Sequence, residues 1–241
     1  MKLAVLDGIL AARSRGSACA LVTELESGNQ RLLQFDEAGL TEQSAADSKL
    51  GGTVLEPDLE PIIRTAITTD RSGVHEVSGK RLFVQVFNRP LRMIVVGGVH
   101  IAQALVPIAI TTGFQVTVVD PRTAFASELR FPGTQLDHQW PDEALEGLDL
   151  DHRCAVITLS HDPKIDDPAL ETALRTDVFY IGSLGSRRTH AARLDRLRQR
   201  DFDDDTLARI HAPVGLDIRA QSTAEIAVAI VAETIQELRK H

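Results

Sequence analysis

The sequence is poor in cysteine and has no long hydrophobic run. Only Cys19 and Cys154 occur among its 241 residues, and two isolated cysteines cannot form an iron–sulfur cluster or a cysteine-rich zinc site within one chain. No apolar stretch approaches the roughly 18–20 residues of a membrane span. The first residues are too acidic and become polar too soon for a secretory signal. We therefore expect a cytoplasmic protein in a reducing compartment, with no membrane partner.

Charge and motif patterns remove further classes of function. The formal net charge of −8 offers no basic surface to nucleic acid. The eight histidines show neither the HxxxH nor the HExxH spacing of a zinc site, and the Gly-x-Ser-x-Gly elbow of hydrolases does not occur. We therefore predict no metal ligands, no catalytic residues and no nucleic-acid partner. Whether the chain is an enzyme is left open by these patterns.

A change of pattern near residue 88 predicts two domains. Residues 1–88 show no regular alternation of strands and helices, and they indicate a smaller α+β domain with strands near 18–22 and 81–87 and a helix near 59–68. The segment Asn88-Arg89-Pro90 interrupts the pattern. We place the boundary there, with the second domain at 89–241.

The second domain alternates buried strands with helices. Runs rich in valine and isoleucine predict strands at 91–96, 115–120, 154–160 and 178–181, and helices are expected at 101–112 and 168–175. This alternation is typical of a doubly wound parallel sheet of the Rossmann type. If the strand order is 3-2-1-4-5, the loops at Gly97 and His161 border the same crevice. Ser222 and Glu225 form a capping box at the start of the last helix. The body of that helix is apolar on nearly all sides, which predicts burial or a homodimer contact.

The glycine turn in IVVGGVHIAQAL resembles a dinucleotide-binding turn with one change. Gly97 and Gly98 follow a strand and precede a helix, and Asp120 ends the next strand, where it would bind a ribose hydroxyl. Val99 occupies the position of the glycine that normally lets a pyrophosphate lie against the backbone. Binding of NAD(P) and a Rossmann turn that has lost its dinucleotide are therefore both open.

Four further side chains are expected at the same edge of the sheet. His100, in the first helical turn, would donate to an anion, and Arg122 would bind a phosphate. His161 and Asp162 follow the 154–160 strand, and the order 3-2-1-4-5 would bring their loop beside Gly97 and make them candidate ligand or acid–base groups. For three of them there is a plain alternative: a solvent-facing His100, a strand-ending turn at Arg122, and Asp162 as a helix cap.

The stretch YIGSLGSRRTH predicts an anion site. Gly182 and Gly185 end a strand and permit an unusual turn, and Ser186 can cap a helix whose first turn carries Arg187 and Arg188. Cations at a helix N-terminus oppose the macrodipole at about 0.3–1 kcal/mol each, so this pair favours a bound phosphate. The alternative is a solvated basic helix, because arginines continue at 193, 196, 198 and 200.

Several of these stretches together resemble the XdhC/CoxI proteins, which serve the maturation of molybdenum hydroxylases such as xanthine and carbon monoxide dehydrogenases. The resemblance covers most of residues 91–233. It is carried by GGVHIAQAL, VTVVDPR, RFPG, SHDPKIDDPAL, YIGSLGSRRTHAARLDRL and IHAPVGLDIRAQSTAEIAVAIVAE. The family commonly reads Gly-Ala-Gly-His-Val in the glycine turn.

The amino-terminal region diverges from this pattern. Arg15-Gly16-Ser17 matches the family's Arg-Gly-Ser-x-Pro-Arg motif, but Cys19 and Ala20 replace its Pro-Arg pair. The family's Gly-Gly-Cys-Val-Glu motif is reduced to Gly51-Gly52 with a distant Glu56, and Arg219 stands where the family usually has glycine.

The resemblance implies a maturation factor that binds molybdenum cofactor, a phosphorylated pterin dithiolene, protects it and inserts it into an apo molybdenum hydroxylase. It also implies a cysteine desulfurase as a further partner where the metal centre is sulfurated. The alternatives are an NAD(P)-dependent oxidoreductase, suggested by the Rossmann context and Asp120, and a partner protein that docks on a hydroxylase and binds nothing small.

Overall fold

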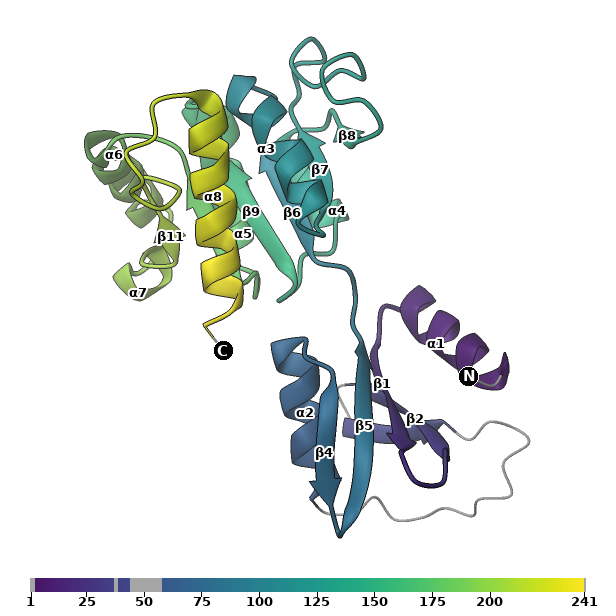
Figure 1. The fold of residues 1–241 in the computed structure, drawn as a ribbon. Helices are drawn as coiled ribbons and strands as arrows, with labels where there is room; N and C mark the ends of the chain where they lie inside the picture. Colours follow the sequence, from purple (N-terminus) through teal and green to yellow (C-terminus); the bar gives the residue numbers. More distant parts are fainter. Residues whose placement is uncertain (1–2, 37–38, 44–57, 241) are drawn as a thin grey trace. The chain divides into compact units, whose positions relative to one another are not determined.

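The structure, a computed structural model, describes residues 3–36, 39–43 and 58–240 (Figure 1). It forms two compact units, with the division between Arg89 and Pro90. The Gly51-Gly52 and Glu56 positions lie outside the described residues.

The amino-terminal unit is an antiparallel sheet with a helix on each face. Its strand order is β3-β2-β1-β5-β4. The strands are β1 (Ala18–Glu24), β2 (Gln30–Asp36), β3 (Gly39–Gln43), β4 (Gly73–Val77) and β5 (Lys80–Phe87), and the helices are α1 (Leu3–Ser14) and α2 (Leu59–Thr69).

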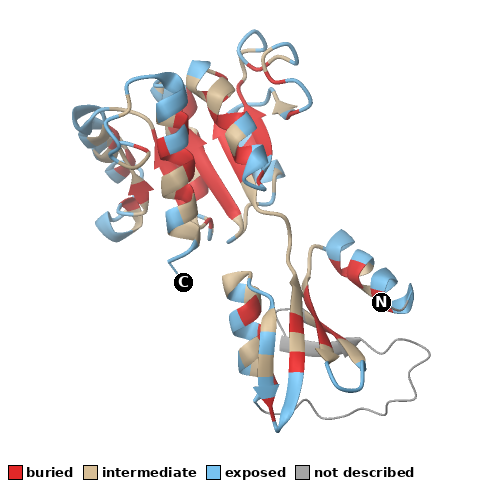
Figure 2. Ribbon diagram, in the orientation of Figure 1, coloured by how far each residue is buried: buried red, intermediate tan, exposed pale blue. Residues whose placement is uncertain are grey.

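The alternation of side chains along β1 explains the two layers. Ala20 and Val22 pack in the cluster that contains α2, whereas Cys19 and Leu21 pack in the cluster that contains α1. Successive side chains of a strand point to opposite faces, so one buried strand serves both helices and is buried along most of its length (Figure 2).

The second unit is a six-stranded parallel sheet of order β11-β10-β9-β6-β7-β8. The strands are β6 (Arg92–Val96), β7 (Gln115–Val119), β8 (Gln135–Asp137), β9 (Cys154–Thr158), β10 (Tyr180–Ser183) and β11 (Ile210–His211). The first five strands of this unit have the order 3-2-1-4-5, which meets the condition set in the sequence analysis, and the Rossmann-like fold is confirmed. The short strands β8 and β11 are additions to the sequence prediction.

Helices cover both faces of this sheet. They are α3 (His100–Thr111), α4 (Pro141–Gly147), α5 (Pro163–Leu174), α6 (Arg187–Arg198), α7 (Asp204–Leu207) and α8 (Thr223–Leu238). One core cluster joins α3 and α8 to one face, and a second joins α4, α5 and α6 to the other. The predicted capping box of Ser222 and Glu225 is present, and the apolar body of α8 packs beside α3 with Ala227 and Ile230 buried.

Two predicted element boundaries were wrong. Helix α5 begins at Pro163, five residues before the predicted start at Pro168, because Asp162 caps it and a proline is well tolerated at the first helical position. The strand predicted at 178–181 lies at Tyr180–Ser183, so Gly182 is inside β10 instead of ending it. A Cβ at Gly182 would lie 2.6 Å from Cγ2 of Val214, so this glycine makes room for packing within the core.

Candidate functional site

The site residues predicted from the sequence lie at the carboxyl ends of the parallel strands. The loop after β6 and the loop after β9 touch there: a Cβ on Gly97, whose φ is +103°, would lie 2.8 Å from the backbone nitrogen of Ser160. Strands β6 and β9 are neighbours in the sheet while their following helices cover opposite faces. This is the switch point at which open α/β sheets bind ligands.

The glycine turn after β6 uses its own N–H groups internally. Gly97 donates to the carbonyl of Val119 at 2.8 Å, Gly98 to the Asp120 carboxylate at 2.8 Å, and Val99 to the carbonyl of Gly97 at 2.9 Å. A dinucleotide pyrophosphate needs such donors at a helix N-terminus. His100, which follows in α3, is exposed.

A loop following β7 covers this turn. A Cβ at Gly98 would lie 2.6 Å from the carbonyl oxygen of Phe125, so only glycine fits beneath the loop. Arg130 connects the glycine turn to the covering loop, because its Nη1 donates to the carbonyls of Gly98 at 2.6 Å and Phe125 at 2.7 Å. The sequence analysis did not find Arg130, although it lies in the RFPG motif.

Asp120 is fully buried and both its oxygens are engaged. Besides Gly98, it accepts bonds from the backbone N–H of Arg122 at 3.0 Å and from the Arg122 guanidinium at 2.7 and 2.8 Å. Burial raises the pKa of Asp120, but the hydrogen bonds from Arg122 and Gly98 outweigh it and hold the pKa below its ordinary value. A ribose hydroxyl would therefore have to displace Arg122 from this carboxylate.

The loop after β9 presents His161 in a strained conformation. His161 has a φ of +62°, in the left-handed region that non-glycine residues rarely adopt, and its side chain is exposed. Asp162 accepts a bond from the backbone N–H of Lys164 at 3.0 Å and caps α5. Asp162 therefore has the structural role that the sequence left as an alternative. Strain of this kind is common at ligand sites.

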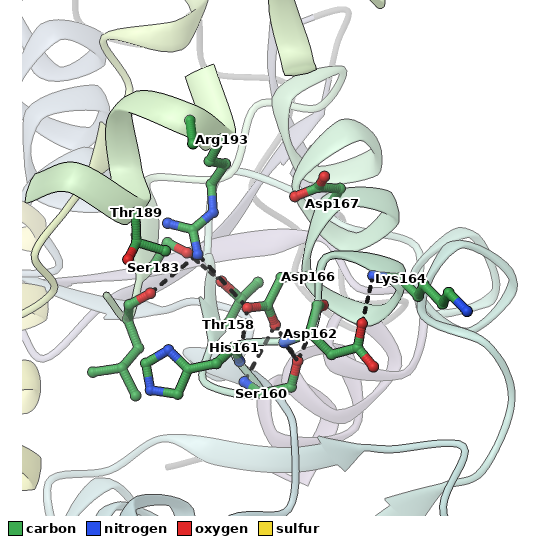
Figure 3. A network of polar contacts seen from close by, with 12 residues as sticks. Thr158, Ser160, His161, Asp162, Lys164, Asp166, Asp167, Ser183, Thr189 and Arg193 are labelled. Atoms are coloured by element: carbon green, nitrogen blue, oxygen red, sulfur yellow. Dashed lines mark hydrogen bonds and ion pairs between the residues drawn. The ribbon is translucent and has the colours of Figure 1, made fainter. Parts of the chain in front are cut away.

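Asp166 and Arg193 form a buried ion pair beside the loop after β9 (Figure 3). Asp166 accepts bonds from the Ser160 N–H at 3.2 Å, the Ser160 hydroxyl at 2.7 Å and the His161 N–H at 3.1 Å. Arg193 lies 3.7 Å from the other side of this carboxylate and donates to the carbonyl of Leu184 at 3.0 Å. The pair thus links the loop after β9 to the loop after β10.

Sequence reasoning misses both members of this pair. The run of arginines places Arg193 on a solvated basic helix face, yet only 2% of it is exposed. A weak signal exists, because Arg193 and the buried Leu197 are spaced i, i+4 on α6 and therefore share one face. Asp166 likewise shares a face of α5 with Ala169, Leu170 and Ala173.

The turn after β10 leaves cations exposed. Gly185 has a φ of +143°, and Ser186 caps α6 by accepting a bond from the Thr189 N–H at 3.2 Å, as predicted. Arg187 and Arg188 are exposed in the first helical turn, and neither has an ion pair or hydrogen bond within the part of the chain that the structure describes. An arginine pair of this kind suits a phosphate oxyanion.

The predicted residues thus fall into two groups at one edge of the sheet. Gly97, Gly98, His100, Asp120 and Arg122 surround the glycine turn, whereas His161, Asp162, Gly185, Ser186, Arg187 and Arg188 belong to the loops after β9 and β10. Over residues 3–36, 39–43 and 58–240, no three His, Cys, Asp or Glu side chains are grouped as metal ligands would be. Within those same ranges, no helix is long and apolar enough to cross a membrane.

Comparison with known proteins places this fold in a family. The family model described as the XdhC Rossmann domain matches residues 93–234. The chain belongs to the XdhC family.

Two curated relatives and one solved structure extend this assignment. The molybdenum cofactor insertion chaperone PaoD of Escherichia coli is 30% identical over 64% of this chain and 42% of its own length. A probable xanthine dehydrogenase component of Bacillus subtilis is 31% identical over 76% of this chain and 53% of its own length. This chain therefore spans about half the length of the relatives it matches.

The solved structure is that of a protein from Bacillus halodurans described as a xanthine dehydrogenase. It matches with a TM-score of 0.70 at 24% identity, covering 98% of this chain and 64% of that protein. At this identity the likeness concerns the fold, and it extends over both units.

The backbone conformation at Arg219 explains why the family usually has glycine at this position. Arg219 stands where the family resemblance leads one to expect glycine, and its φ is +58°. A left-handed backbone costs a non-glycine residue roughly 1–2 kcal/mol. The turn between β11 and α8 therefore keeps a conformation suited to glycine, although this chain carries arginine there.

Proposed function

We propose that this XdhC protein binds a phosphorylated pterin of the molybdenum cofactor type and inserts it into an apo molybdenum hydroxylase. Membership of the XdhC family and the likeness to an insertion chaperone support the proposal. The cofactor is cargo here, and no chemical step on it is assigned to this chain. As proposed ligand-binding residues we retain Gly97, Gly98, His100, Asp120, Arg122, His161, Asp162, Gly182, Gly185, Ser186, Arg187 and Arg188, the first five and Gly182 acting chiefly through the shape of the site.

The observation that carries the proposal is the contrast between the two turns at the switch point. The N–H groups of Gly97, Gly98 and Val99 donate to Val119, Asp120 and Gly97, so at this turn only the N–H groups of the first turn of α3 lack an acceptor among the described residues. The exposed arginines of the α6 turn are available to an anion. A ligand with a terminal phosphate and a body unlike a dinucleotide matches this arrangement better than NAD(P).

The remaining parts of the proposal concern the surroundings of the protein. A cytoplasmic location is supported by Cys19 and Cys154, which are free thiols although both are buried. Burial raises the pKa of Cys19 to about 11 and that of Cys154 to about 12, so neither is a reactive thiolate. A homodimer and a cysteine desulfurase partner complete the proposal as further elements to be tested.

The decisive experiment measures molybdenum in the hydroxylases of cells that lack this protein. We expect one hydroxylase to accumulate as polypeptide with little metal and little activity, while other molybdenum enzymes keep theirs because pterin synthesis is intact. Wild-type protein should restore the metal content. Restoration should be weaker with His161→Ala or with Arg187→Ala/Arg188→Ala.

The same strain tests the alternatives. An NAD(P)-dependent oxidoreductase predicts full metal content in every hydroxylase and consumption of NAD(P)H by the purified protein with a metabolite. A docking protein without a ligand predicts loss of metal, but purification from the cell without any bound pterin. Mass spectrometry of material released from the purified protein separates these outcomes.

A further inference from the structure

Besides the exposed Arg187 and Arg188, a third cation lies near the start of α6, and it is buried. Arg193 lies one and a half turns further along the same helix and reaches back toward the Leu184–Ser186 segment, between Thr189 and Asp166 (Figure 3). Its Nη1 lies 3.9 Å from the position that a Cβ on Gly185 would occupy. The guanidinium is therefore directed at the turn from the protein side, opposite the exposed arginines.

This buried guanidinium is only partly satisfied. Nη2 donates to the carbonyl of Leu184 at 3.0 Å, whereas Nε and Nη1 have no hydrogen-bond partner among the described residues. Asp166 lies 3.7 Å away, and its oxygens already accept three bonds from Ser160 and His161. Burial lowers the pKa of Arg193, and attraction to Asp166 offsets this only in part. Unpaired buried donors on a charged group are costly, so this arrangement suits an additional anionic acceptor.

The backbone of the turn offers donors to the same point. The N–H groups of Gly185, Ser186, Arg187 and Arg188 have no acceptor among the described residues. The first turn of α6 carries no acidic residue. The nearest carboxylates are otherwise engaged, because Asp167 pairs with Arg196 at 2.6 and 2.9 Å and Asp162 caps α5. Free N–H groups and the helix dipole both favour a negative ligand at this terminus.

We propose that the turn Leu184–Arg188, with the buried Arg193 beneath it, is a binding site for a phosphate monoester. The identity of the molecule that carries the phosphate, a phosphorylated pterin or a mononucleotide, rests on the proposed function. The phosphate site itself does not. This turn is preferred over the glycine turn because the two arginines beside the glycine turn are engaged, Arg122 with Asp120 and Arg130 with the carbonyls of Gly98 and Phe125. A dinucleotide such as NAD, whose pyrophosphate is esterified at both ends, lacks a terminal phosphate dianion and is disfavoured.

The test is a titration of the purified full-length protein followed by calorimetry and by phosphorus NMR. The probes are phenyl phosphate, AMP and NAD. We expect saturable one-to-one binding of phenyl phosphate and AMP and weaker binding of NAD. Stronger binding of AMP than of phenyl phosphate points to a mononucleotide as carrier, whereas equal binding leaves the phosphate as the recognised group. Absence of saturable phenyl phosphate binding overturns the proposal.

Arginine variants locate the site. Arg187→Ala/Arg188→Ala should weaken phenyl phosphate binding at least about tenfold, because charge-assisted hydrogen bonds are lost. Arg198→Ala/Arg200→Ala is the matched control, since it removes two exposed cations from the other end of the same helix segment. Equal losses in the two double variants mean bulk electrostatic attraction and overturn the site.

Arg193→Lys tests the buried cation while keeping a positive charge beside Asp166. We expect folding to persist and phenyl phosphate affinity to fall several-fold, because lysine lacks the planar fork of arginine. Unchanged affinity in Arg193→Lys removes Arg193 from the site. Failure of this proposal is distinguishable from failure of the proposed function. If only the phosphate site is wrong, phenyl phosphate does not bind, but a hydroxylase of the deletion strain still lacks metal. If only the proposed function is wrong, phenyl phosphate binds, but the metal content of the hydroxylases in the deletion strain is normal.

Discussion

Two turns of the same Rossmann unit follow the same local pattern and reach opposite states. After both β6 and β10 the chain leaves a buried strand, passes a glycine with positive φ and enters a helix. In the first turn Gly97, Gly98 and Val99 donate to acceptors of the protein itself. In the second the donors and the side chains of Arg187 and Arg188 are unpaired within the described residues. The two turns therefore differ in the use of their glycine-loop N–H groups and in their arginines, which are unpaired only in the second turn among the described residues.

The two turns also differ in the carboxylate that supports each. Asp120 beside the first turn is bound by Arg122 at 2.7 and 2.8 Å, and its pKa lies below the ordinary value. Asp166 near the second is buried with its arginine 3.7 Å away, and burial raises its pKa despite the bonds from Ser160. Asp120 and Arg122 are joined by two hydrogen bonds, whereas Asp166 and Arg193 are 3.7 Å apart. The second arginine therefore keeps donors for a ligand and the first does not.

The largest effect should follow from removing the buried cation. Arg193→Ala leaves Asp166 as an uncompensated buried charge, and the loss of one partner of such a pair costs about 3–5 kcal/mol of unfolding free energy. Arg198→Ala, which removes two exposed ion pairs with Asp195 and Asp204, should change the unfolding free energy far less, because water screens such pairs. Denaturant unfolding followed by the fluorescence of Trp140, the only tryptophan, measures both. Similar costs for the two variants would contradict the role of the buried pair.

A single methyl group added at Gly98 tests whether the loop after β7 covers the glycine turn. Gly98→Ala places a Cβ 2.6 Å from the carbonyl oxygen of Phe125, which should cost about 1–3 kcal/mol of unfolding free energy through overpacking. Gly147→Ala is the control, since no atom lies within 4 Å of its Cβ position. That change should be neutral or stabilising by up to about 1 kcal/mol. If Gly98→Ala is as well tolerated as Gly147→Ala, the loop does not cover the turn as described.

The two carboxylates should titrate on opposite sides of the ordinary aspartate value of about 4. Because the folded-state pKa of Asp120 is lowered, its contribution to stability is full above that value and is lost as the pH falls through the folded pKa. For Asp166 the folded pKa is raised, so its ionisation reduces stability as the pH rises from about 4 through that pKa.

Carboxyl-carbon NMR against pH measures both groups directly, with Asp120→Asn and Asp166→Asn used to assign the signals. The difference in unfolding free energy between wild type and Asp120→Asn should also shrink as the pH falls below about 4. A titration of Asp120 above Asp166 would reverse the electrostatic contrast between the two turns.

The smallest expected effect is at position 99. Val99→Gly restores the glycine of the dinucleotide fingerprint, but the Gly98 N–H and the Asp120 oxygens stay engaged. NAD affinity should therefore remain unchanged within error in a calorimetric titration. Val99→Gly/Arg122→Ala, which also frees the carboxylate of Asp120, is the comparison. A clear gain of NAD affinity in the single variant would show that the side chain of Val99 alone closes the turn.

Much of the Rossmann unit can be predicted because local patterns determine it. Continuous apolar runs place β6, β7 and β9, and the alternation of strands and helices implies a parallel sheet. The N-cap at Ser186 and the capping box at Ser222 and Glu225 are readable because a cap depends on neighbours within a few residues. The errors come where local signals conflict, as at Pro163 and Pro168, which both lie in α5.

In the amino-terminal helix α1 the periodicity itself is ambiguous. Leu3, Leu6, Ile9 and Leu10 are spaced like one apolar face of a helix. The structure instead buries Val5, Ile9 and Ala12 and leaves the three leucines exposed. A helix that is apolar on more than one side can bury either side, and contact with β1 and β2 decides which.

The sequence by itself determined the fold class of the second unit and the family to which it belongs, because those depend on short-range patterns and motifs. Only the tertiary structure decided in which turn the loop N–H groups and the arginines are free. Gly98 donates to Asp120, which lies 22 positions away, and its carbonyl accepts from Arg130, which lies 32 positions away in the loop that covers the turn. The burial of Arg193 depends on α5 and α6 packing beside β9 and β10. A hydrogen-bond donor is used or free according to what lies within about 3 Å of it, and that distance is set by the packing of distant segments.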